Sequence, residues 1–126
     1  MDKIWEELYN AARAVQDGRR ISEYVEAGGV AAAVLSDSGK IYTGVCVDTA
    51  CTLGICAERN AITNGEHRIS KVIAIMPDGN SGAPCGSCRE LMTQLMPEDY
   101  RNIEIMIDYS AGKVKTLGEL TPEWWI

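Results

Sequence analysis

The chain has little positive charge and no long hydrophobic run, and these two absences exclude broad classes of function. Only 12 Lys and Arg residues stand against 18 Asp and Glu residues, which gives a formal charge of −6. A field of this sign repels a polyanion, so we expect no nucleic-acid polymer as a partner. The longest nearly apolar run, 28–35, is far too short to span a bilayer, and no basic, apolar leader opens the sequence. We therefore expect no membrane partner either.

Chain length and cysteine content predict a compact protein of a reducing compartment. A chain of 126 residues is long enough to bury the core of one domain, 1–126, and leaves no room for a second. Its five cysteines are odd in number and two of them share one Cys-x-x-Cys motif, which does not suit a disulfide scaffold. We expect a cytoplasmic location.

Hydrophobic periodicity predicts helices that alternate with strands. Apolar residues recur at helical spacing near the N-terminus, and the turn residues of 36–39 join two β-branched runs into a hairpin. The run 71–76 is continuously apolar, as in a strand buried on both faces. This order predicts an α/β fold, a three-layer α-β-α sandwich with a mixed central sheet of about five strands. The expected helices are 3–16, 56–65 and 86–96, and the expected strands are 30–35, 40–47, 71–76, 103–107 and 113–116.

Three cysteines have the spacing of an open zinc site. Cys85 and Cys88 lie three residues apart, so both sulfurs face one side of a single helical turn. Cys56 starts a second helix after a loop at 52–54, and two helix N-termini favour thiolate over thiol. Three protein ligands leave the fourth tetrahedral position to water, whose pKa zinc lowers towards ~7. This pattern predicts a hydrolase.

A redox site and a structural zinc site explain this cysteine pattern less well. A thioredoxin-like redox site needs neither Cys56 nor Glu58, and a structural zinc site needs a fourth ligand. The only histidine, His67, follows an apparent turn and is expected to be a solvated loop residue. Arg59 can donate hydrogen bonds to sulfur and so restore Lewis acidity that three thiolates reduce.

The segment from Thr43 through Cys56-Ala57-Glu58-Arg59 to Ile62, with Pro84-Cys85-Gly86-Ser87-Cys88-Arg89 later, resembles the cytidine deaminases. The likeness is to their short, three-cysteine, homotetrameric form and covers roughly residues 20 to 125. It implies Zn²⁺ as cofactor, held by the three cysteines, and Glu58 as a glutamate that is no ligand but moves protons. It also implies a free pyrimidine nucleoside as substrate, contact with it by Ala57, and a place in pyrimidine salvage.

The residues that would hold the sugar hydroxyls depart from that family's pattern. Where cytidine deaminases carry asparagine and glutamate, this chain has Cys46 and Asp48. Cys46 is a poor hydrogen-bond partner, and Asp48 reaches one carbon less. The aromatic residue usual before the first strand is replaced near Gly28 and Gly29, and the chain has no Phe. Cytidine or deoxycytidine is the expected substrate, with a blasticidin-S-type nucleoside or another aminated heterocycle as the alternative, and a catalytically idle zinc module as a third interpretation.

The two tryptophans at the C-terminus allow two interpretations. By spacing, Trp125 matches the aromatic residue that reaches the base in a neighbouring subunit's site in the short deaminases. Alternatively, Trp124 and Trp125 close this chain's own core. Two adjacent indoles are costly to leave in water, so a partner surface and a homotetramer are expected.

Overall fold

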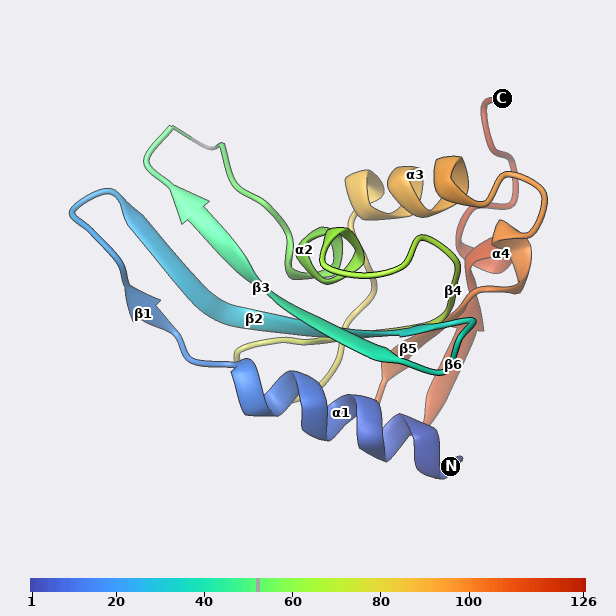
Figure 1. The fold of residues 1–126 in the computed structure, drawn as a ribbon, viewed down its shortest axis with the longest axis horizontal. Coiled ribbons are helices and arrows are strands. Elements are labelled where there is room, and N and C mark those ends of the chain that lie inside the picture. The colour runs from blue at the N-terminus through green and yellow to red at the C-terminus, as the bar shows by residue number, and fades with distance from the viewer. Residues whose placement is uncertain (52) are drawn as a thin grey trace.

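The chain opens with a helix and three successive strands, and further helices and strands are interleaved after them (Figure 1). A computed structural model describes residues 1–51 and 53–126; Thr52, expected in a loop, lies outside the described residues. The helices are α1 (Lys3–Val15), α2 (Ala57–Thr63), α3 (Gly86–Leu95), the 3-10 helix η1 (Tyr100–Asn102) and α4 (Leu117–Leu120). The strands are β1 (Arg19–Arg20), β2 (Val25–Ser36), β3 (Ile41–Thr49), β4 (Ile69–Ile75), β5 (Glu104–Asp108) and β6 (Lys113–Thr116).

A mixed sheet of six strands forms the middle layer. β2 pairs antiparallel with β1, β3 and β4, while β4 pairs parallel with β5, and β5 pairs antiparallel with β6. The sheet has one strand more than expected, because Arg19–Arg20 pairs with the first part of β2. β2 also starts earlier than the expected 30–35, since its pairing with β3 continues beyond a register shift between Ala27 and Ala31. Gly28 and Gly29 lie inside this shift, and glycines are not typical of a strand, so the sequence pattern did not predict the first part of β2.

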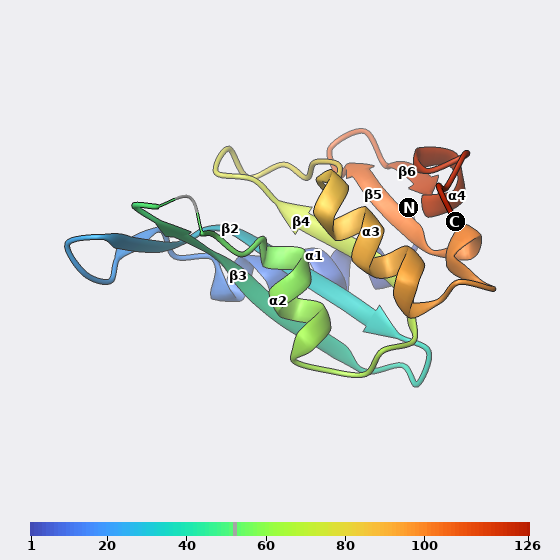
Figure 2. The same cartoon turned by 90° about the horizontal axis from the view of Figure 1, so that it is seen from above.

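Both faces of the sheet are buried, which confirms the three-layer sandwich. Neighbouring residues of a strand point to opposite faces, so β2 and β4 each supply residues to two separate hydrophobic clusters. α1 covers one face and α2 and α3 lie side by side over the other (Figure 2). The cluster under α1 includes Trp5, Leu8, Ala12, Ala31, Ala33, Ile73, Ile75 and Met106. The cluster under α2 and α3 includes Ala32, Val34, Ala61, Ile62, Val72, Ala74, Met92 and Ile105.

Strand direction brings the starts of α2 and α3 to the same edge of the sheet. β3 and β4 both run antiparallel to β2, so they are parallel to each other and end at one edge. The loop after β3 leads to α2, and the loop after β4 leads to α3. Backbone bridges between Val47 and Ile55 and between Ile75 and Ser81 hold these loops against their strands. The carboxyl ends of parallel strands are where ligands bind in open α/β sheets.

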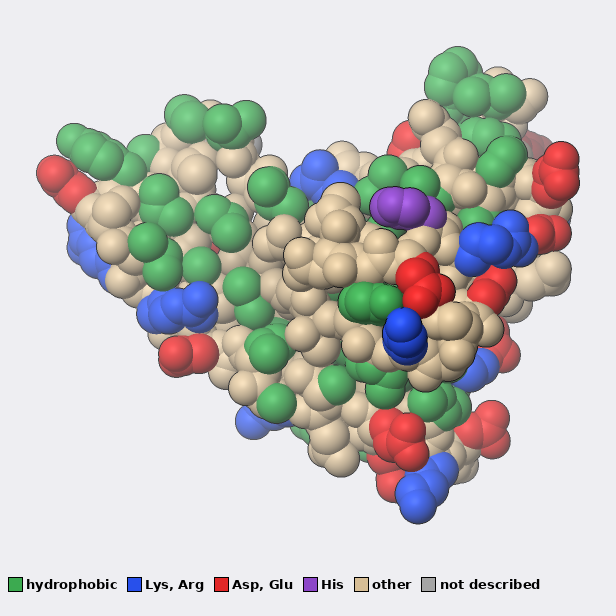
Figure 3. Space-filling view, viewed as in Figure 1, with side chains coloured by type: hydrophobic (Ala, Val, Ile, Leu, Met, Phe, Trp, Pro, Cys, Tyr) green, Lys and Arg blue, Asp and Glu red, His purple; other side chains and the backbone are tan. Residues whose placement is uncertain are grey.

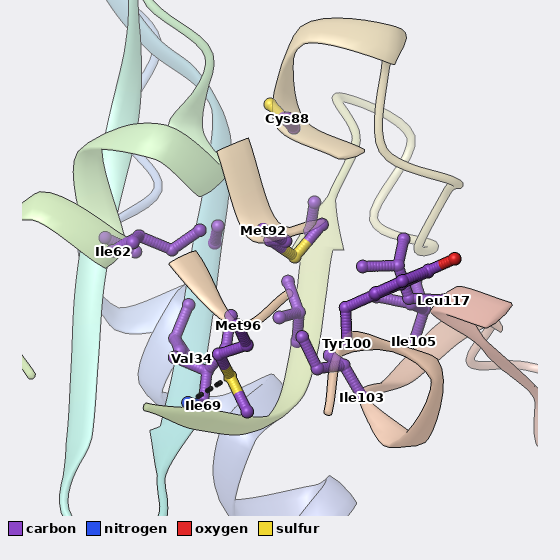
Figure 4. Packing of buried hydrophobic residues seen from close by; sticks show 14 of the residues in the cluster. Val34, Ile62, Ile69, Cys88, Met92, Met96, Tyr100, Ile103, Ile105 and Leu117 are labelled. Atoms are coloured by element: carbon purple, nitrogen blue, oxygen red, sulfur yellow. Dashed lines mark hydrogen bonds between the residues drawn. The ribbon is translucent and has the colours of Figure 1, made fainter. Parts of the chain in front are cut away.

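The hydrophobic cluster under α2 and α3, the second cluster, holds α3 against the sheet (Figure 4). Cys88 and Met92 have no exposed surface, and Met96 is 5% exposed. The backbone N–H of Ile69 donates a hydrogen bond to Met96 Sδ over 3.3 Å, which joins the end of α3 to the start of β4. The first turn of α3 therefore stands on a packed core.

Candidate metal centre and active site

Three cysteine sulfurs meet where α2 and α3 begin. Cys56 is the N-cap of α2, Cys85 is the N-cap of α3, and Cys88 lies in the first turn of α3. Cys56 Sγ lies 3.4 Å from Cys85 Sγ, and Cys85 Sγ lies 3.6 Å from Cys88 Sγ. The structure thus assembles the ligand set that the spacing predicts, from loops that are far apart in the sequence.

The sulfur geometry fits zinc. Tetrahedral zinc with Zn–S bonds of ~2.3 Å places its sulfurs ~3.8 Å apart. The three sulfurs lie within 4.8 Å of one another, and within residues 1–51 and 53–126 no fourth His, Cys, Asp or Glu joins them. The only histidine, His67, is exposed in a loop, as expected. A three-sulfur set with an open fourth position is the arrangement of a catalytic zinc site rather than of a closed structural one.

The surroundings of Cys56 and Cys88 favour the neutral thiol unless a cation binds. Burial raises the pKa of the Cys88 thiol, and the nearby charge of Glu58 raises it further. Burial also raises the pKa of the Cys56 thiol, with a further contribution from its hydrogen bond to Cys85. Thiols in such a place ionise when a metal ion binds them, so the donor set suits a metal better than free thiolates.

Arg59 supplies a positive charge beside the sulfurs. Its Nη2 lies 3.8 Å from Cys56 Sγ, one turn along α2 from that cysteine. Its Nε is buried and has no hydrogen-bond partner among the described residues. The guanidinium therefore lies against the donor set with a donor still to be satisfied.

Glu58 presents a buried carboxylate in the same place. It lies in the first turn of α2 and is only 5% exposed. Burial raises the pKa of its carboxyl group above the usual value. A carboxyl group with a raised pKa is protonated more readily than an exposed one, which suits a group that takes up and releases protons.

A cavity of about 360 Å³ lies over these residues. It brings together most of the residues that the sequence singled out, since Cys46, Asp48, Ala57, Glu58 and Arg59 all line it with two of the cysteines. Sequence reasoning missed the apolar walls, although one of them directly precedes Cys56 and another directly follows β4. The missed lining residues are Val30, Gly54, Ile55, Met76 and Ala83.

Cys46 and Asp48, which the sequence suggests as sugar contacts, are partly engaged with the protein itself. The backbone N–H of Val30 donates to Cys46 Sγ over 3.3 Å, which links β3 to β2. Cys46 Sγ in turn lies 3.8 Å from Asp48 Oδ2. Both residues line the cavity, and their contact with a substrate stays a prediction.

The two tryptophans differ in burial, although both indole N–H groups donate to the Glu90 carboxylate. Trp124 packs against the second hydrophobic cluster, with its ring edge-on to Tyr100 at a centroid distance of 5.5 Å. Trp125 is 75% exposed, and its indole N–H donates to Glu90 Oε1 over 3.1 Å. The expectation of a pair that closes the chain's own core is right for Trp124 and wrong for Trp125.

Known proteins share this chain's motifs and fold. The sequence profile described as cytidine and deoxycytidylate deaminase zinc-binding region matches residues 5–101. The chain belongs to this family. It is therefore a zinc-dependent hydrolase of the cytidine deaminase family, with Cys56, Cys85 and Cys88 in a metal-binding arrangement.

Individual members of the family agree with this assignment. A cytidine deaminase of Halalkalibacterium halodurans is 28% identical over 101 residues, which cover 74% of each protein. The crystal structure of cytidine deaminase from Mycobacterium leprae superposes with a TM-score of 0.76 at 29% identity, over 97% of this chain and 100% of that one. The enzyme from Mycobacterium tuberculosis gives a TM-score of 0.74 at 25% identity, over 99% of each chain. In the described part of this family member, no helix is both long and apolar enough to cross a membrane.

Proposed function

We propose that this protein deaminates free cytosine nucleosides by hydrolysis and converts cytidine or deoxycytidine to uridine or deoxyuridine and ammonia. The observation that carries the proposal is the buried carboxylate of Glu58 beside the sulfur cluster, at a cavity of about 360 Å³. A carboxylate there that is not itself a ligand is what an acid and base catalyst of such a site needs.

The cavity walls suit a flat heterocycle. Val30, Ile55 and Met76 offer apolar surface, while the polar groups gather towards the metal and the sugar strand. A pocket that is mostly apolar with few polar groups orients a base by those groups and excludes water around it. The exocyclic amine of the base then lies towards the cysteines and Glu58.

Glu58 moves the protons of the reaction. Lewis acidity that makes water nucleophilic near neutral pH comes from the zinc ion held by the three cysteines. Glu58 takes a proton from the water as its oxygen bonds to the amine-bearing ring carbon, and gives that proton to the ring nitrogen. The second proton of the water reaches the amine through the same carboxylate, the bond from carbon to nitrogen breaks, and ammonia leaves the keto base. The raised pKa of the Glu58 carboxyl group suits both the uptake and the release of the proton.

Arg59 and Ala57 support that step. The guanidinium, 3.8 Å from Cys56 Sγ, offsets the negative charge of the thiolates and so preserves Lewis acidity. Ala57 is 1% exposed and lines the cavity, which supports a contact of its backbone with the substrate.

The proposal extends to the assembly. Trp125 is exposed and outside the chain's own cavity, which is consistent with a contact to the base in a neighbouring subunit's site. We propose a homotetramer in which this contact is made. The acidic charge of −6 favours a free nucleoside over a nucleic-acid polymer.

Replacement of Glu58 tests the mechanism. Glu58→Gln keeps the shape and removes the proton shuttle, so we expect about one zinc per chain as in the wild type and a loss of turnover on the order of 10²-fold or more. Zinc is measured by elemental analysis and turnover by ammonia release. The control is Glu98→Gln, an exposed glutamate after α3.

The same assay separates the possible functions. Cytidine, deoxycytidine, a blasticidin-S-type nucleoside and free aminated bases are compared as substrates. Near-normal rates in Glu58→Gln contradict the mechanism. Release of ammonia from none of these compounds contradicts deamination and leaves a zinc module that only binds.

A further inference from the structure

A second cavity adjoins the candidate active site. It has a volume of about 270 Å³, and its lining includes Gly18, Arg19, Arg20, Glu26, Gly29 and Asp48. Asp48 also lines the metal-site cavity, so the two cavities meet at this side chain. Asp48 lies on the strand expected to hold the sugar. The second cavity is therefore the neighbouring space on the far side of Asp48 from the cysteines.

Glycines keep the second cavity open. A Cβ atom built on Gly29 meets no described atom within 4 Å, so a side chain here projects into free space. A Cβ on Gly18 lies 3.7 Å from the Gly29 Cα, which leaves the two backbones close together. Gly28, with φ of 85°, allows the register shift of β2 at this point. The space exists because Gly28 and Gly29 carry no side chains, whereas Glu26 and Ala27 before them line the cavity.

Charges of both signs line the cavity in a defined row. Strand pairing places Arg20 opposite Glu26, and Glu26 opposite Asp48, across β1, β2 and β3. Directly paired residues share one face of the sheet, so the Arg20, Glu26 and Asp48 side chains lie on the same side. The two carboxylates offer acceptors for a positively charged group, and the guanidinium offers donors for a negative one.

The arginines also keep hydrogen-bonding capacity. Arg19 donates to the Asp17 carbonyl, and Arg20 donates to the carbonyls of Ser22 and Glu23. In the part of the chain that the structure describes, neither guanidinium forms an ion pair. Both retain N–H groups that suit a carboxylate.

We propose that this cavity is a second substrate subsite, and that the nucleoside bears a zwitterionic, amino-acid-like substituent on its sugar. The ammonium group lies at Glu26 and Asp48, and the carboxylate lies at Arg19 and Arg20. A purely anionic substituent faces two carboxylates, and a purely cationic one faces two guanidiniums, so a group with both charges matches the lining best. This inference rests on the proposed deamination of cytosine nucleosides.

Substrate analogues test the charge requirement. Cytidine is compared with a 5′-deoxycytidine that carries L-homocysteine through a 5′-thioether, and with the matching thioethers that end in an amine alone or a carboxylate alone. We expect kcat/KM for the zwitterionic compound to exceed that of cytidine by about tenfold or more, as one net charged contact supplies. The single-charge compounds fall between the two.

Variants locate the effect in the cavity. Gly29→Ala and Gly29→Leu fill the free space in two steps, so the preference for the zwitterionic compound over cytidine shrinks with Ala and approaches one with Leu. Arg19→Gln and Arg20→Gln weaken the zwitterionic and carboxylate compounds, whereas Glu26→Gln weakens the zwitterionic and amine compounds. Arg13→Gln, an exposed arginine of α1, is the matched control.

The outcomes separate the two proposals. If cytidine releases ammonia and no analogue exceeds it, or if a single-charge compound equals the zwitterionic one, the subsite inference is overturned while deamination stands. If no cytosine compound releases ammonia from a zinc-loaded protein, the proposed function itself fails. A preference that persists in Gly29→Leu also overturns the subsite, and zinc content verifies that this variant is folded.

Discussion

Single carboxylates in this protein differ because their surroundings differ. Burial raises the pKa of Glu58. Asp108 shows the reverse, since hydrogen bonds from Asn80, then Ser110, then the backbone N–H of Ala111 lower the pKa of its carboxyl group. The first environment suits proton transfer, and the second stabilises a permanent negative charge.

The charge of Asp108 is predicted to stabilise the protein in a pH-dependent way. Its folded pKa is lowered, so this stability is present above the unfolded pKa of ~3.9 and disappears as pH falls through the folded value. Asp108→Asn keeps an acceptor oxygen and removes the charge. We expect a lower Tm than wild type at pH 7 and a difference that shrinks as pH falls below the unfolded pKa of ~3.9.

Thermal unfolding followed by circular dichroism across this pH range measures the effect. Asp78→Asn is the control, because Asp78 accepts a single backbone hydrogen bond in an exposed turn. A Tm difference that is the same at pH 7 and pH 3 contradicts the prediction.

At the scale of elements, the contact of α2 with β3 sets the position of Cys56 and Glu58. Asn60 of α2 and Asn64, its C-cap residue, donate to the carbonyls of Val45 and Thr43 over 2.7 and 2.9 Å. The helix also lies directly on Gly44, where an added Cβ would stand 2.4 Å from the Ala61 nitrogen. The backbones of β3 and α2 are in direct contact at Gly44, so no side chain fits between them.

Gly44→Ala is predicted to push α2 off the sheet. Overpacking against a helix backbone typically costs about 1–3 kcal/mol, so we expect a clear fall in Tm. The displacement also moves Cys56 away from Cys85 and Cys88, so we expect weaker zinc retention in a chelator competition. Gly29→Ala is the control, since its methyl group meets no described atom within 4 Å. Equal zinc retention in both variants would show that α2 does not depend on this contact.

At the scale of the whole molecule, exposed apolar side chains gather at two separate places. Figure 3 shows hydrophobic side chains at both upper ends of the visible face, with a hollow between them. One group lies near the active-site cavity and includes Ile21, Tyr24, Leu53 and Ile55, which are 45–76% exposed. The other is at the C-terminus, where Trp125 and Ile126 are 75% and 74% exposed. Large apolar groups at such exposure are typical of surfaces that a partner covers.

We therefore predict a homotetramer. Light scattering at micromolar concentration is expected to give four chains of 13.7 kDa. Trp125→Ala is expected to raise KM for the nucleoside or to weaken the assembly, while Val114→Ala, an exposed apolar residue of β6, is the control. A monomer with full activity would contradict the prediction and remove Trp125 from any site.

Local sequence patterns determined most of the elements and the metal ligands. The turn at 36–39, the apolar run of β4 and the periodicity of α1 each follow from residues that are neighbours in the chain, so they could be predicted. The cysteine spacing was equally informative, because coordination chemistry allows few donor sets. What could not be predicted from neighbours was β1, whose two arginines form a strand only because the first part of β2 lies beside them.

Only the tertiary structure decided what lies around the cysteines. Val30, Ile55, Met76 and Ala83 come from separate loops and strands, and they form one cavity because β3 and β4 end at the same edge of the sheet. The sequence likewise left Trp124 and Trp125 as a pair. Packing distinguished them, since the Trp124 ring packs edge-on to Tyr100 whereas Trp125 stays 75% exposed. The type and spacing of the metal ligands can be read from a short stretch of sequence, whereas the burial of a residue depends on contacts between distant parts of the chain.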